Sequence, residues 1–103
     1  MNDLFTSTQT VTAYRLSLKF IKRAKRGYLG VPIPECIKSN RTHAWIDASH
    51  PSVSELRWLA GWLGNPDPHS REQGHIKPSE MTIGRAAELA FQRPETLTVE
   101  VTA

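Results

Sequence analysis

The chain has 103 residues, of which 39% are hydrophobic and 22% are charged, and its formal net charge at pH 7 is +3. This length and composition fit a single small domain, residues 1–103, built on one hydrophobic core. Cys36 is the only cysteine, so a disulfide within the chain is excluded. No apolar run approaches the roughly 18 residues that span a bilayer, and the first ten residues lack the apolar stretch of a secretory signal. We therefore expect a cytoplasmic protein without a membrane segment.

The charge is divided unevenly along the chain. Residues 1–41 contain eight Lys and Arg against two carboxylates, which gives +6, and residues 42–103 contain five against eight, which gives −3. The two parts either neutralise each other within the fold or leave a basic face for an anionic partner.

Residues 11–26 are predicted to form a basic amphipathic helix. At about 100° per residue, its apolar side chains gather on one side and its cations on the other. Thr10 or Thr12 is suited to the N-cap, and Gly27 is suited to a left-handed C-terminal cap. A strand is the alternative, because apolar and polar residues also alternate from residue 15 to residue 20. The helix accounts for more residues, and it lines up five cations, Arg15, Lys19, Lys22, Arg23 and Arg26.

Two short strands are predicted, at about residues 42–47 and 96–102. In both segments apolar side chains alternate with polar or aromatic ones, which is the pattern of a half-buried strand. A lone strand cannot satisfy its own backbone. We expect the two segments to pair with each other, and pairing with another chain is the alternative for the second.

A second helix is predicted over about residues 52–63. Ser52 and Glu55 have the spacing of a capping box, in which each side chain accepts a hydrogen bond from a free backbone N–H of the first turn. Gly64 follows at the position where a helix commonly ends.

Trp58 and Trp62 lie one turn apart in this helix and outside its apolar stripe. One core rarely covers so wide an arc of a helix. Either both indoles cover the core under the extended segment 28–36, or part of their surface faces a partner.

A third helix is predicted over about residues 80–92, with Ser79 as its cap and Pro94 beyond its end. The three helices and the one strand pair together predict an α+β fold that is mainly helical.

The segment 64–77 is predicted to be an exposed loop that contains prolines. Its charged and polar side chains exclude it from a core, and the Asn65–Pro66 and Asp67–Pro68 bonds are of the kind that isomerises slowly in flexible loops. It is either a mobile link or a presented peptide, one that docks in the groove of a partner or offers an X-Pro bond to a prolyl isomerase.

Known catalytic and metal-binding patterns are missing from the sequence. Cys36, His43 and His50 recur every seven residues, but a structural zinc site requires closer ligand pairs and usually more than one cysteine. Asp47, Ser49, His50 and Ser52 lack the nucleophile elbow of a hydrolase, and there is no P-loop or dinucleotide fingerprint. We expect a protein that is not an enzyme and that holds no cofactor and no metal.

The segments "YRLSLKFIKRAKRG", "LRWLAGWLG" and "NPDP" together resemble the accessory proteins of lambdoid phages, in particular the anti-RecBCD modulators of the P22 type. The resemblance implies a non-catalytic inhibitor or modulator in the host cytoplasm that binds a RecBCD-like nuclease-helicase, with a prolyl isomerase as a second partner at the loop. A small DNA- or RNA-binding protein that places the same cations on phosphates is the alternative. The residues predicted to contact the partner are Arg15, Lys19, Lys22, Arg23, Lys25, Arg26, Tyr28, Trp58, Trp62, Asn65, Pro66, Asp67 and Pro68.

Overall fold

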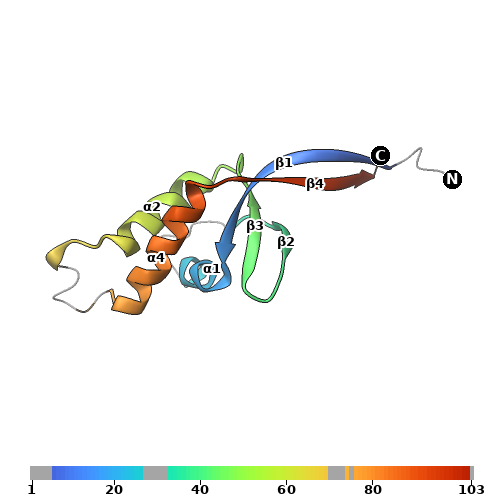
Figure 1. The fold of residues 1–103 in the computed structure, drawn as a ribbon. Helices are drawn as coiled ribbons and strands as arrows, with labels where there is room; N and C mark the ends of the chain where they lie inside the picture. Colours follow the sequence, from blue (N-terminus) through green and yellow to red (C-terminus); the bar gives the residue numbers. More distant parts are fainter. Residues whose placement is uncertain (1–5, 27–32, 70–73, 75, 103) are drawn as a thin grey trace.

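The structure is a computed structural model that describes residues 6–26, 33–69, 74 and 76–102 (Figure 1). Within these ranges the chain forms an antiparallel sheet of four strands in the order β2-β3-β1-β4, together with three helices. In chain order the elements are β1 (Thr6–Ser17), α1 (Leu18–Lys25), β2 (Cys36–Ser39), β3 (His43–Asp47), α2 (Val53–Gly64), α4 (Pro78–Phe91) and β4 (Glu95–Thr102). None of these helices is long and apolar enough to cross a membrane.

The prediction of a mainly helical fold is wrong. The sheet is a full layer of the molecule, and it curls so that α1, α2 and α4 lie against its inner side (Figure 1). Two of the four strands, β1 and β2, were not predicted. The other two strands and the helices α2 and α4 lie within two residues of their predicted bounds.

The predicted helix 11–26 is in fact a strand followed by a helix. Threonine occupies every second position from Thr6 to Thr12, and β-branched side chains favour a strand over a helix. At Ser17 the backbone is still extended, and its side-chain oxygen accepts a hydrogen bond from the N–H of Phe20 at 3.2 Å. Ser17 thus ends β1 and caps α1 at the same time.

The helical wheel nevertheless placed five apolar side chains on one side, of which four are buried and the fifth, Tyr14, is partly buried against the core. Leu16 faces inward from the strand with a period of two, and Phe20, Ile21 and Ala24 face inward from the helix with a period near 3.6. Because the two periods overlap across the junction, one helical wheel placed all four side chains on one side.

The core lies between the inner face of the sheet and the three helices. Ala44 and Ile46 of β3 reach it, whereas Trp45 between them points to the outer face, as strand alternation requires. The largest fully buried side chains among the described residues are Leu16, Phe20, Ile46, Leu56, Leu59 and Leu63.

The helices α2 and α4 cross at two glycines. A Cβ added at Gly84 would stand 2.4 Å from the backbone nitrogen of Gly64 and 2.6 Å from the Cβ of Leu63. Neither distance is possible for real atoms, so the close approach of the two helices requires glycine at position 84.

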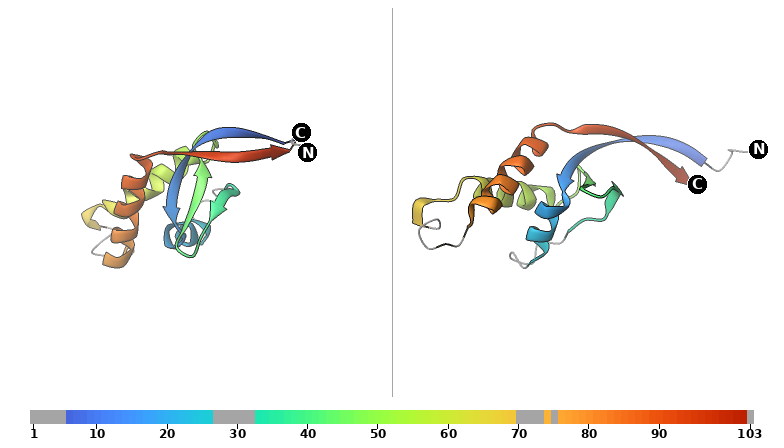
Figure 2. Two further views of the ribbon diagram at one scale, coloured as in Figure 1. Left: turned by 45° about the vertical axis from the view of Figure 1, so that its right-hand side comes forward. Right: turned by 60° about the horizontal axis from the view of Figure 1, so that its bottom comes forward.

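The predicted pairing of residues 42–47 with residues 96–102 is wrong. Both segments are strands, but β1 lies between them and pairs with β3 on one side and with β4 on the other. The β1–β4 pair runs from Thr6 to Ala13 and extends beyond the helices as a two-stranded arm (Figure 2). The arm contributes to an elongated molecule, with extents of 63 × 24 × 23 Å.

The predicted helix caps also differ from those observed. Ser52 precedes α2, but its hydroxyl lies 2.8 Å from Nδ1 of His50 and makes no capping hydrogen bond. The helix α4 begins two residues earlier than predicted, so Lys77 and not Ser79 is its N-cap residue. Pro78 then occupies the first helical turn, where its missing N–H costs nothing.

Candidate functional site

Cations of α1 and of the residue that follows it surround a small hollow. Lys19, Lys22 and Arg23 line it from α1, Arg26 lines it from the C-cap, and Glu80 and Ile83 close it from α4, around a volume of about 250 Å³. Lys25 is also exposed but lies outside this hollow. We call Lys19, Lys22 and Arg26 the basic triad.

Arg23 is less accessible to a partner than the basic triad, because its side chain is bound within the fold. Its guanidinium forms an ion pair with Glu80, and both side chains are 17% exposed. Burial raises the pKa of Glu80, but the hydrogen bond from Arg23 and the backbone N–H of Lys77 outweigh it and hold that pKa below its ordinary value. Arg23 therefore joins α1 to α4, and the charge of the hollow comes from the basic triad.

Arg15 does not lie with the other cations. It projects from β1 on the outer face of the sheet, where it pairs with Glu95 of β4 at 3.5 Å. Glu95 also accepts a hydrogen bond from the indole N–H of Trp45 at 3.0 Å, and Lys38 of β2 stands 4.3 Å from the centre of the same ring. The predicted line of five cations is thus wrong, since Arg15 belongs to a polar cover over Trp45.

The indoles of Trp58 and Trp62 stack on the surface of α2. Their ring centres are 6.2 Å apart and their planes differ by 5°. Trp62 packs partly against the core, whereas Trp58 is 53% exposed. Trp62 thus partly covers the core, and Trp58 is the indole whose exposed part is accessible to a partner.

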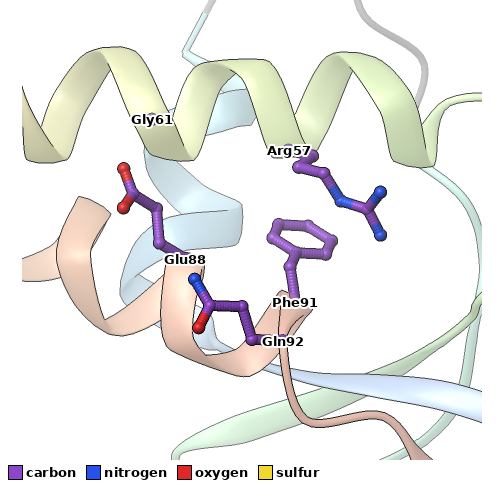
Figure 3. Close-up of a pocket in the computed structure, with 5 residues that line it drawn as sticks. All are labelled: Arg57, Gly61, Glu88, Phe91 and Gln92. Atoms are coloured by element: carbon purple, nitrogen blue, oxygen red, sulfur yellow. The ribbon is translucent and has the colours of Figure 1, made fainter.

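A second hollow, of about 450 Å³, lies between α2 and α4 (Figure 3). Arg57 crosses its end, with its guanidinium carbon 5.5 Å from the centre of the Phe91 ring and with a hydrogen bond of 2.8 Å to the Tyr14 hydroxyl. Gly61 and Glu88 line the opposite end. Arg57 was not among the predicted contact residues. In the sequence, Arg57 lies on the polar side of α2, and no local pattern indicates its contacts with Tyr14 of β1 and Phe91 of α4.

The predicted contact residues of the proline loop differ in their accessibility. The side-chain amide of Asn65 donates a hydrogen bond of 2.8 Å to Glu88, and Pro66 is buried. Asp67 and Pro68 are exposed. Among the described residues no peptide bond is cis, and Pro68 begins a helical turn.

The structure thus brings some of the predicted contact residues together and separates others. The basic triad is one surface, the stacked tryptophans are a second, and the exposed end of the loop follows α2 directly in the chain. Tyr28 lies outside the described residues. Among the residues that the structure describes, no three His, Cys, Asp or Glu side chains gather in a way that could hold a metal ion.

Comparison with known proteins gives no relative, since no family model, no curated protein and no solved structure matches the chain.

Proposed function

We propose that this chain is a non-catalytic binding protein that docks on a protein partner through the exposed face of α2. The exposure of Trp58 carries the proposal. A tryptophan that is half exposed, fixed by a second stacked indole and mounted on a helix loses little conformational entropy when it binds, and such residues supply much of the affinity at protein interfaces.

The basic triad would complement acid side chains at the rim of such an interface. Charges at a rim mainly raise the rate of association and fix orientation, while a central aromatic residue determines how long the complex lasts. The resemblance to phage anti-RecBCD modulators suggests the partner to try first, a host nuclease-helicase that processes DNA ends in the cytoplasm. The exposed Asp67–Pro68 end of the loop would provide the second contact, where a prolyl isomerase would have access to Pro68 but not to the buried Pro66.

The second candidate is a small nucleic-acid-binding protein, and the basic triad favours it. Three cations around one hollow are able to contact neighbouring phosphates, and an exposed indole is able to stack on a base.

Affinity capture from a cell lysate, with and without nuclease treatment, separates the two candidates. A protein partner should remain bound after nuclease treatment. Trp58→Ala should weaken its capture about thirtyfold, as expected for an interface hot spot. Leu89→Ala is the matched control, because Leu89 is 52% exposed and lies on α4. Loss of the partner on nuclease treatment, or equal effects of the two substitutions, would contradict the proposal.

A further inference from the structure

In the part of the chain that the structure describes, the arm formed by β1 and β4 leaves one edge of β1 without a neighbouring strand. Among the described residues, β3 pairs with β1 only from Ala13 to Ser17, while β4 pairs with β1 along the other edge from Thr6 to Ala13. Two-stranded ribbons are marginally stable in water, and a third strand or a covering layer normally supports them. In the figures no described helix covers the arm (Figures 1 and 2).

The hydrogen bonds at the end of this edge show which backbone groups face outward. The N–H of Leu18 donates to Thr42, and the C=O of Thr12 accepts from Ala48 at 2.9 Å, both on the β3 side of β1. The N–H and C=O groups of one strand residue point to the same edge, and successive residues point to opposite edges. Thr6, Thr8 and Thr10 therefore point their backbone groups to the same edge as Thr12, which is the open edge of the arm.

The two outer edges of the arm differ in how they are protected against pairing. The strand β4 begins directly after Pro94, and it carries two carboxylates, Glu95 and Glu100. Charges and proline are the features that keep natural edge strands from joining another strand. The open part of β1, residues 6–12, has no charged residue, no proline and no glycine. It is the unprotected edge.

We propose that two copies of this chain pair through the open edges of β1, antiparallel to each other, around a two-fold axis at Thr8. Thr8 then stands opposite Thr8 of the second copy, and Thr6 stands opposite Thr10. All three residues face the edge, so the pairing forms about six backbone hydrogen bonds. The two arms become one four-stranded sheet with the order β4-β1-β1-β4.

A second copy fits this edge because the edge is complementary to itself. Every position from Thr6 to Val11 is uncharged, so the antiparallel pairing brings no like charges together, whereas the same pairing of two β4 edges would bring carboxylates close. Where β1 meets the body, a hollow of about 420 Å³ lies along residues 9–12 and 47–49 and gives the incoming strand room. The pairing does not depend on the protein partner proposed above.

Sedimentation of the full chain over a wide range of concentrations tests the pairing. The wild-type chain should pass from monomer to dimer. Thr10→Pro removes an N–H that faces the open edge. The two-fold axis places this change in both copies, so the dimer loses two backbone hydrogen bonds, and its dissociation constant should rise about tenfold or more. Thr98→Pro is the matched control, because Thr98 lies directly opposite Thr10 and its N–H faces the outer edge of β4. A monomer at all concentrations, or an equal loss of dimer in both variants, would overturn the proposal.

Cysteine cross-linking tests the axis without relying on proline. In a Cys36→Ser background, Thr8→Cys should form a disulfide-linked dimer on mild oxidation, since opposite residues of paired strands have Cα atoms about 5.5 Å apart. Glu100→Cys, at the exposed position opposite Thr8 on β4, should not. Cross-linking that is equal at the two positions, or stronger at position 100, would rule out the β1 edge as the interface.

Discussion

At the scale of single residues, the contact between Gly64 and Gly84 fixes how closely α2 and α4 approach. Gly84→Ala should destabilise the protein by about 2 kcal/mol, because the added methyl group would overlap backbone atoms that cannot move without separating the helices. Gly61→Ala, on the same pair of helices, places its methyl group 3.5 Å from the Glu88 carboxylate and should be neutral or stabilise by up to about 1 kcal/mol. Urea unfolding of the two variants checks this, and an equal loss of stability would contradict the packing.

The ion pair of Arg23 and Glu80 predicts a dependence of stability on pH. The pKa of Glu80 is lower in the folded chain than its ordinary value of 4.5. A lowered carboxyl pKa stabilises the fold above the ordinary value, and this contribution is lost as the pH falls through the lowered one. Glu80→Gln should therefore cost on the order of 1 kcal/mol at neutral pH, and this cost should shrink as the pH falls below the ordinary value. Urea unfolding of both proteins across this range measures the difference, and a gap that does not narrow in acid would count against the ion pair.

At the scale of elements, the junction between β1 and α1 depends on Ser17. Its hydroxyl oxygen accepts the N–H of Phe20, one of the donors that the first turn of α1 leaves free. Ser17→Ala should lower the free energy of unfolding by about 1 kcal/mol. Ser54→Ala, near the start of α2, should change it little, because the Ser54 hydroxyl donates only a long hydrogen bond of 3.5 Å to the carbonyl oxygen of Pro51. Thermal unfolding of the two variants compares them, and equal shifts in Tm would contradict the role of Ser17.

The same junction explains which elements the sequence could predict. The segments that became α2, α4, β3 and β4 each have a single hydrophobic period, and the sequence predicted all four. The segment from Thr6 to Lys25 changes its period at Ser17, and the helical wheel that fitted its second part was extended over the first. The alternating threonines of residues 6–12 were the signal for the strand.

At the scale of the whole molecule, the sequence could not predict which strands are neighbours. The partners of β4 and β3 depend on β1, which lies far from β4 in the chain, and no local pattern records such a pairing. The same limit applies to the candidate site. Sequence placed the basic triad on an exposed helix face and left the exposure of Trp58 open. Only the assembled fold shows that Arg23 is bound to Glu80 and that Arg15 lies over the outer face of the sheet.

The most direct test measures how the affinity for the captured partner depends on salt concentration. It shows whether the affinity comes mainly from the tryptophan surface or from contacts between cations and phosphates. The account predicts a shallow fall in affinity with salt and a loss of about thirtyfold in Trp58→Ala at every salt concentration. Three phosphate contacts by Lys19, Lys22 and Arg26 would instead give a slope of about −3 in a plot of log affinity against log salt concentration. That slope, together with an unchanged affinity in Trp58→Ala, would contradict the account.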